Sequence, residues 1–341
     1  MNTENFKAVK ALLASPKKIV ITTHRNPDGD AYGSSLALYQ YLLSLKHDVV
    51  IVSPNDCPDF LKWLPAEKDI VVFENDLEKA SKLLYDAALI FTLDFNALSR
   101  VGKLMQEVLE KVSATYIMID HHQQPEAYAT YMFSDPTSCS TCQMVYQFFE
   151  KMEAVDNIDK DIATCLYTGI VTDTGSFKYQ STTSETHRIT ASLLELGINH
   201  TKIHNQLYDT NSHNRLQLLS RALRNLKILP NYNTAYISLS QQEMNSFHFK
   251  KGDTEGFVNY ALSLKGIELA VIFIEDQKQG IIKISFRSKG DFSVNAFARK
   301  HFNGGGHENA AGGRSDESLQ KTILNFLEIV PTYKKELLND A

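Results

Sequence analysis

Acidic and imidazole side chains gather in four short segments, and each segment directly follows an apolar stretch of the chain. The segments are His24-Arg25-Asn26-Pro27-Asp28-Gly29-Asp30 after KIVITT, Asp94 after ALIFTL, Asp120-His121-His122 after TYIMI, and Asp173-Thr174-Gly175-Ser176 after CLYTGIVT. In an open α/β sheet, ligands bind beyond the carboxyl ends of the strands. The pattern therefore predicts that these side chains converge on one edge of a sheet.

Each segment alone also has a structural explanation. Asp-Gly and Asn-Pro form turns, and Asp94 could cap a helix. Together, however, converging carboxylates and imidazoles would repel one another or stay unsatisfied unless a cation lies among them. Mixed histidine and aspartate ligands suit manganese, iron, cobalt or zinc, whereas magnesium sites usually lack imidazole. The joint placement therefore favours a metal centre.

The elements that must position these residues alternate along the first half of the chain. Short β-branched runs predict strands at 18–23, 48–52, 69–73, 88–93 and 115–119. Helical patterns are expected at 30–44, 76–85, 98–111, 138–153, 159–171 and 184–196, after a first amphipathic helix at the N-terminus. Such alternation is typical of βαβ units and a parallel sheet.

The pattern changes after Gly197. Residues 198–229 are predicted to be helical, and strands follow at 234–239, 268–274 and 280–286. A helix is expected at 293–301, a glycine-rich loop at 304–313 and a last helix near 317–328. We therefore expect a first domain at 1–197, a helical connector at 198–213 and a second domain at 214–341.

Composition limits the class of protein. The chain has 341 residues, 43% of them hydrophobic and 22% charged, which fits a two-domain globular protein. No apolar run approaches the roughly 20 residues that span a bilayer. Four cysteines are too few for a disulfide framework, which favours a reducing, cytoplasmic location. The net charge of −5 argues against a broad binder of long nucleic acid but is compatible with a small anionic substrate held by metal.

Specific motifs also connect the chain to a known family. HRNPDGDAYGSS, LDFN, IDHH and VTDTGSF, in this order, resemble the DHH phosphoesterase family. The later stretch FRSKGDFSVNAFARKHFNGGGHENAAGG resembles its companion domain, DHHA1. The length and layout are similar to the nano-RNase and pAp phosphatase subgroup. The resemblance implies an α/β fold, with an N-terminal parallel-sheet DHH domain, a smaller C-terminal α/β DHHA1 domain and an active site in the cleft between them.

The resemblance further implies a two-metal site. One ion would be held by His24, Asp28 and Asp94, and the other by Asp30, Asp94, His121 and Asp173, so that Asp94 bridges the two. Asp120 would orient a histidine, and His122 would face the substrate phosphate or assist the leaving group. Manganese is favoured, with magnesium, cobalt or iron as alternatives. Two such ions would supply a hydroxide near neutral pH and neutralise charge on the phosphate.

The second domain is expected to select the substrate. Gly304, Gly305 and Gly306 lack side chains, so their backbone N–H groups could approach a phosphate closely. The neighbouring His307, and Arg287-Ser288 at a strand end, are predicted to bind the phosphate or the base, Arg287 through its planar guanidinium. Arg100, which follows the second motif, is expected to orient Asp94 or the substrate.

The function implied is hydrolysis of short oligoribonucleotides to mononucleotides, together with phosphatase activity on 3′-phosphoadenosine 5′-phosphate (pAp). Short single-stranded RNA or small nucleotides are the expected partners, without long duplexes or a membrane, and the sequence leaves a homodimer open. A linear or cyclic dinucleotide phosphodiesterase is the nearest alternative because it uses the same metals. A RecJ-like exonuclease is normally longer, and a pyrophosphatase normally lacks the GGGH stretch. A silent nucleotide sensor is disfavoured because the expected ligand positions are filled.

Overall fold

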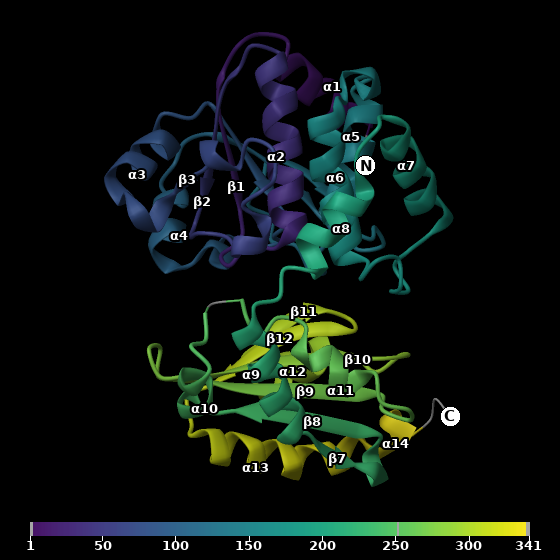
Figure 1. Ribbon diagram of the computed structural model, residues 1–341. Helices are drawn as coiled ribbons and strands as arrows, with labels where there is room; N and C mark the ends of the chain where they lie inside the picture. The colour runs from purple at the N-terminus through teal and green to yellow at the C-terminus, as the bar shows by residue number, and fades with distance from the viewer. Residues whose placement is uncertain (1–2, 251, 339–341) are drawn as a thin grey trace. The chain divides into compact units, whose positions relative to one another are not determined.

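Two separate β-sheets organise the chain, one before and one after the junction of Thr210 and Asn211. The computed structural model describes residues 3–250 and 252–338 (Figure 1). Contacts within the chain divide it into two units, Met1–Thr210 and Asn211–Ala341. Each unit has its own hydrophobic cores. No helix in the described residues is both long enough and apolar enough to cross a membrane.

The first unit is built on a parallel sheet, as the alternating pattern predicted. Its strands run in the order β3-β2-β1-β4-β5-β6, and each neighbouring pair is parallel. The order reverses beside β1, so β1 and β4 are neighbours although β2 and β3 separate them in sequence. The strands are β1 (Lys18–Thr23), β2 (Asp48–Ser53), β3 (Val71–Val72), β4 (Leu89–Leu93), β5 (Thr115–Asp120) and β6 (Tyr131–Ser134).

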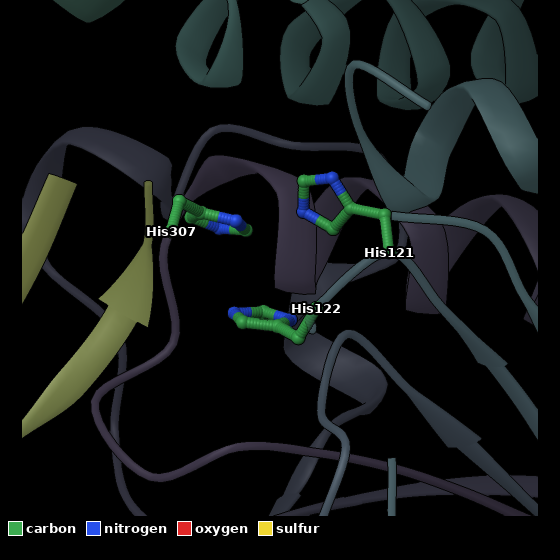
Figure 2. A group of neighbouring side chains, drawn as sticks. All are labelled: His121, His122 and His307. Carbon is green, nitrogen blue, oxygen red and sulfur yellow. The ribbon is translucent and has the colours of Figure 1, made fainter. Parts of the chain in front are cut away.

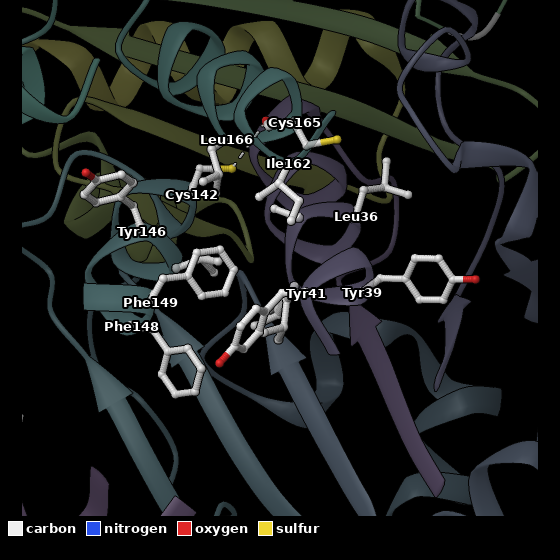
Figure 3. Close-up of a cluster of buried hydrophobic side chains, with 14 of the residues drawn as sticks. Leu36, Tyr39, Tyr41, Cys142, Tyr146, Phe148, Phe149, Ile162, Cys165 and Leu166 are labelled. Carbon is white, nitrogen blue, oxygen red and sulfur yellow. Dashed lines mark hydrogen bonds between the residues drawn. The ribbon is translucent and has the colours of Figure 1, made fainter. Parts of the chain in front are cut away.

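Helices cover both faces of this sheet because its strands are apolar on both sides. Ile19 and Ile21 of β1 pack with α1, α2, α5 and α6, whereas Val20 packs with α3 and α4 on the opposite face. The helices are α1 (Thr3–Leu12), α2 (Gly29–Ser44), α3 (Leu77–Tyr85), α4 (Lys103–Leu109), α5 (Thr141–Lys151), α6 (Lys160–Asp173), α7 (Ser184–Glu195) and α8 (His200–Tyr208). In the larger core, the rings of Tyr41 and Phe149 lie 4.7 Å apart, and Ile162 and Leu166 of α6 pack nearby (Figure 3).

Three local predictions for this unit were wrong. Strand β6 (Tyr131–Ser134) was missed because it is only four residues long and mostly half-buried, so its apolar signal is weak. The strand predicted at 69–73 shortens to two residues and continues as a 3-10 turn at Phe73–Asn75. The helix predicted from residue 98 starts as the 3-10 turn Leu98–Val101, which ends at Gly102 with φ +86° before α4 begins.

The second unit contains a mixed sheet in the order β11-β12-β10-β9-β8-β7. Only β8 and β9 pair in parallel within the described residues. The strands are β7 (Lys227–Leu229), β8 (Thr234–Leu239), β9 (Leu269–Asp276), β10 (Ile281–Ser288), β11 (Gly305–His307) and β12 (Ala310–Ser315). The helices are α9 (His213–Arg224), α10 (Gln241–Ser246), α11 (Phe257–Leu262), α12 (Val294–His301), α13 (Leu319–Ile329) and α14 (Lys334–Leu338).

Two predictions for this unit also need correction. The predicted helical stretch 198–229 ends in a strand, because Lys227–Leu229 pairs with β8 at the edge of the sheet. The glycine-rich segment 304–313 is a strand pair and not a loop. A Cβ on Gly304 would lie 2.0 Å from the Gly312 carbonyl oxygen, so glycine here permits close approach of two backbones.

Candidate metal centre

The site begins at His24, the first residue after β1. Its side chain is buried, and its Nδ1 lies 3.0 Å from the carbonyl oxygen of Arg25. A carbonyl only accepts, so Nδ1 carries the proton and Nε2 keeps its lone pair. That Nε2 lies 3.3 Å from Asp94 Oδ2 and 4.0 Å from Asp28 Oδ2. The imidazole thus presents a ligand atom to two carboxylates.

Asp28 and Asp30 flank the start of α2. Asp28 Oδ1 caps the helix by accepting from the backbone N–H groups of Asp30 and Ala31, both at 3.1 Å. Its Oδ2 is the atom near His24. Asp30 is completely buried and faces a second imidazole, with Oδ2 3.7 Å from His121 Nε2. One turn of helix therefore aims two carboxylates in different directions.

Asp94 lies at the centre of the site. It follows β4 in a left-handed conformation, with φ +66°, and its N–H donates to Ile119 O on β5. Backbone strain of this kind is concentrated at functional sites. Besides His24, its carboxylate lies 3.5 Å from His121 Nε2 and 3.7 Å from His122 Nδ1. Asp94 therefore lies within 4.0 Å of three histidines.

The histidine pair follows β5, and its rings are 5.2 Å apart (Figure 2). His121 Nδ1 lies 3.1 Å from Ser138 O, so its Nε2 is left for carboxylates. His122 is held differently, because its Nδ1 lies 2.7 Å from Asp120 Oδ1. Asp120 itself is completely buried. The two imidazoles therefore have distinct surroundings although they are adjacent in sequence.

Asp173 ends helix α6 and completes the group around His121, with Oδ2 3.2 Å from Nε2. The chain then turns sharply, because Gly175, Ser176 and Phe177 all have positive φ values of 55° to 67°. Such a run is unusual for residues with side chains. The turn ends α6 directly after the carboxylate.

The chemistry of these donors fits divalent metal ions. Two imidazoles, each with its proton fixed on Nδ1, direct Nε2 lone pairs at carboxylate oxygens 3.2–4.0 Å away. Facing lone pairs repel unless a proton or a cation lies between them. Among the groups of ligand atoms that lie within 4.8 Å of one another and could hold an ion, two consist of predicted metal ligands and share Asp94. These groups are His24, Asp28 and Asp94, and Asp30, Asp94 and His121.

The pKa values of the site residues in the absence of an ion also indicate repulsion between the acids. Burial and the neighbouring carboxylates of Asp30 and Asp28 raise the pKa of Asp94 well above its usual range. Burial opposes the charge on His121, yet Asp173, Asp30 and Asp94 raise its pKa to about 9. Burial, Arg100 and His121 lower the pKa of His122 well below its usual range. A cation would relieve the repulsion between the acids.

Arg100 lies close enough to the site for its charge to lower the pKa of both His24 and His122. Its backbone oxygen accepts from the N–H of Arg25 at 2.8 Å, which ties this segment to the first motif. Among residues 3–250 and 252–338, no hydrogen bond or ion pair of the Arg100 guanidinium is found. A cation of this kind is suited to an anionic ligand.

Apart from Arg100, the residues predicted to bind substrate lie in the second unit. Arg287 and Ser288 end β10, and Arg287 Nη1 donates to Phe286 O at 2.9 Å. The buried Ser288 hydroxyl donates to Phe292 O and accepts from Asn309 Nδ2. These Ser288 contacts hold the loop after β10, and a role in substrate binding stays a prediction. His307 ends β11.

The glycine segment also has a structural role. The Gly304 N–H donates to Ala298 O at 3.2 Å, and the Gly306 N–H donates to Asn295 Oδ1 at 3.1 Å. These two amides are bonded within the chain, and binding of a phosphate by this segment stays a prediction. Gly306, with φ +153°, and Gly304 are required by the close pairing of β11 and β12.

Sequence reasoning missed Thr141 and Ser138, which contact the site from the segment before and at the start of α5. Ser138 anchors His121 through its carbonyl oxygen. Thr141 contacts two of the carboxylates. Neither residue belongs to a charged motif, and their partners are 17 to 111 residues away in sequence. Local spacing therefore carries no signal for them.

Similarity to known proteins agrees with this geometry. The bifunctional oligoribonuclease and PAP phosphatase NrnA of Thermus thermophilus is 31% identical over 319 residues, covering 89% of this chain and 86% of that protein. The model of the DHH family N-terminal domain matches residues 18–170, and that of the DHHA1 domain matches residues 232–331. The chain belongs to the DHH family. Its site residues after β1, β4 and β5 lie inside the DHH match, and Asp173 lies just beyond it.

Two further similarities extend over most of this DHH-family chain. NrnA of Bacillus subtilis, also named a bifunctional oligoribonuclease and PAP phosphatase, is 27% identical and covers 86% of this chain and 88% of that protein. The crystal structure of an exopolyphosphatase-related protein from Bacteroides fragilis has a TM-score of 0.93 and 40% identity, and the match covers 98% of both chains. The fold of both units is therefore one that a solved structure shares.

Proposed function

We propose that this DHH-family chain is a metal-dependent phosphoesterase that hydrolyses short oligoribonucleotides to mononucleotides and removes the 3′-phosphate of pAp. The observation that carries the proposal is Asp94, whose carboxylate lies 3.3 Å from His24 Nε2 and 3.5 Å from His121 Nε2. The names of the two NrnA relatives support the choice of substrates.

The residues present would hold two divalent ions. We assign His24, Asp28 and Asp94 to one ion, and Asp30, Asp94, His121 and Asp173 to the other. Manganese suits these mixed imidazole and carboxylate donors, and magnesium, cobalt or iron are alternatives. When bound, such ions activate water and neutralise charge on a phosphate.

We assign the substrate phosphate to His122 and Arg100. Asp120 would act through His122. Asp120 Oδ1 fixes the Nδ1 side of His122, so Nε2 is the atom that we assign to the substrate phosphate. An incoming phosphate opposes the effect of Arg100 on His122 and favours the imidazolium. We therefore propose that His122 gains a proton as substrate binds, and that this proton passes to the leaving ribose oxygen.

The distribution of charge supports a substrate-binding role for the second unit. Residues 1–210 contain 18 basic and 27 acidic side chains, a net charge of −9, whereas residues 211–341 contain 17 and 13, a net charge of +4. A basic unit attracts a phosphate backbone. We assign catalysis to residues 1–197, a connector to 198–213 and substrate binding to 214–341, including Arg287 and His307. The four free cysteines are compatible with a cytoplasmic location.

A substrate panel tests this function. Purified protein with manganese would be incubated with di- to pentaribonucleotides, a 24-mer, pAp, linear and cyclic dinucleotides, and pyrophosphate. Mononucleotides from the short RNAs and phosphate from pAp are expected, and Asp94→Ala should abolish both reactions. Preferential cleavage of cyclic dinucleotides would favour the phosphodiesterase alternative. Nucleotide binding without turnover would contradict the proposal and favour a sensor.

A further inference from the structure

Helix α5 begins beside the metal centre, and its first residue, Thr141, is completely buried. The N-cap function of this helix is already supplied by Ser140, whose hydroxyl accepts from the Gln143 N–H at 3.0 Å. The hydroxyl and the N–H of Thr141 are therefore not needed to start the helix. Both point instead to carboxylates that come from other elements.

The hydroxyl of Thr141 is 3.0 Å from Asp94 Oδ1. An ionised carboxylate only accepts, so the hydroxyl is the donor of this bond. The bond joins residues 47 positions apart in sequence. It restrains the carboxylate that lies at the centre of the site.

The backbone N–H of the same residue donates to Asp30 Oδ2 at 2.6 Å, and the Cys142 N–H donates to Asp30 Oδ1 at 2.8 Å. The first N–H groups of a helix have no partner within the helix, and they favour negative charge. Asp30 is therefore held at both oxygens by the first turn of α5. Such bonds to a charged acceptor are stronger than those between neutral groups.

The two oxygen atoms that Thr141 holds are the two that face His121. Asp30 Oδ2 lies 3.7 Å and Asp94 Oδ1 lies 3.5 Å from His121 Nε2. These three atoms form one of the groups that could hold an ion. Thr141 thus contacts both carboxylates of that group, and His121 supplies its imidazole.

We propose that Thr141 is a positioning residue that sets the distance between Asp30 and Asp94, so that both carboxylates and His121 can hold one ion. The proposal rests on the function proposed above. Without the hydroxyl, Asp94 keeps its backbone position but its carboxylate is free to rotate away from Asp30. Hydrogen bonds to the acids that bind a metal typically affect metal affinity by about 10–100-fold.

Three variants test the proposal. Thr141→Val removes the hydroxyl but keeps the shape and the backbone N–H, and Thr141→Ser keeps the hydroxyl. Thr190→Val is the matched control, because Thr190 is also buried on a helix but its hydroxyl donates to its own helix, to Thr186 O at 2.7 Å. Titration calorimetry of metal-free protein with manganese measures affinity independently of turnover.

We expect Thr141→Val to weaken manganese binding at one of two sites by about 10–100-fold. Thr141→Ser should stay close to wild type, and Thr190→Val should not change affinity. Wild-type affinity in Thr141→Val would overturn the proposal, as would equal losses in Thr141→Val and Thr190→Val. If Thr141→Val does not fold, as judged by circular dichroism without metal, Thr141→Ala carries the same test. Wild-type protein that neither binds manganese nor hydrolyses RNA would instead refute the proposed function.

Discussion

The carboxylate of Asp120 lies 2.7 Å from the Nδ1 atom of His122, and both side chains are buried. This contact separates His122 from its neighbour His121, whose Nδ1 is bound by a backbone carbonyl oxygen instead. A carboxylate partner stabilises an imidazolium, whereas a carbonyl only fixes the tautomer. The two adjacent histidines therefore differ in the partner of Nδ1, a carboxylate for His122 and a carbonyl for His121.

Replacing Asp120 by asparagine should lower kcat more than it weakens metal binding. The amide can still accept from Nδ1 but no longer carries the charge that favours a protonated His122. We expect kcat to fall by about 10–100-fold, with manganese affinity changed by less than about threefold. Steady-state kinetics on a diribonucleotide and manganese calorimetry measure the two effects. A loss of metal with unchanged kcat at saturating manganese would show that Asp120 supports the metal and not His122.

Gly169 allows α6 to approach the metal centre. A Cβ at this position would lie 2.2 Å from Cys142 Sγ and 2.8 Å from Asp30 Oδ1. Gly169→Ala should therefore displace Asp30 and destabilise the fold by about 1–3 kcal/mol, the usual cost of overpacking. Urea unfolding and manganese calorimetry measure these two consequences.

A double variant provides the control for this steric explanation. Cys142→Ala removes the sulfur that Gly169→Ala would contact first, so the double variant should recover part of the lost stability. Substitutions at contacting residues show such coupling, whereas the stability changes at independent sites are additive. Strict additivity of the two substitutions would mean that the contact between residues 142 and 169 does not cause the loss.

The buried His47 should make the first unit sensitive to mild acid. Its Nδ1 accepts from the Lys17 N–H at 3.2 Å, and burial lowers its pKa below 6.5. Below about pH 6.5 the His47 imidazole is protonated in the unfolded chain but stays neutral in the folded chain. The contribution of His47 to the free energy of unfolding is therefore fully present above about pH 6.5. As the pH falls from there towards the lower pKa of the folded state, this contribution is lost by at most about 1.4 kcal/mol per pH unit.

Substitution of His47 isolates this effect. We expect the urea midpoint of metal-free His47→Gln to fall less between pH 7.5 and pH 5.5 than that of wild type. His200→Gln is the control because His200 is exposed, and it should follow wild type. The metal-centre histidines contribute equally in all three proteins. An identical pH dependence in His47→Gln would remove His47 as a cause of acid sensitivity.

Arg287→Ala separates the roles assigned to the two units. Arg287 lies at the end of β10 in the second unit, where we assign its guanidinium to a substrate phosphate. Loss of this charged hydrogen bond should raise KM for a short RNA by at least about tenfold. Manganese affinity should not change. Loss of bound metal in this variant would contradict the assignment of substrate binding to residues 214–341.

The sequence predicted the parallel sheet of the first unit because its signal is local. Runs such as KIVITT and TYIMI are β-branched, apolar on both faces and followed by polar residues, as buried parallel strands are. Strand β6 lacks that signal, since only Phe133 in it is fully buried. Glycine is depleted in strands, so the glycine-rich segment 304–313 predicts a loop, yet at Gly304 and Gly306 two backbones meet too closely for a side chain.

The predicted metal ligands are brought together, but the residues that hold them were not foreseen. His24, Asp94 and His121 stand out in sequence because histidine and aspartate follow strands. Thr141 does not stand out, because a threonine near the start of a helix is normally interpreted as a capping residue. Its contacts to Asp30 of α2 and to Asp94 after β4 exist only after these elements and α5 have packed together. Long-range hydrogen bonds of this kind cannot be read from spacing.

In the site that we propose, His24, Asp94 and His121 surround a pair of divalent ions. Anomalous X-ray scattering from crystals grown with manganese tests this arrangement most directly. We expect two manganese peaks, both within coordination distance of Asp94, one beside His24 Nε2 and the other beside His121 Nε2. A single peak away from Asp94, or none at saturating manganese, would contradict the claim.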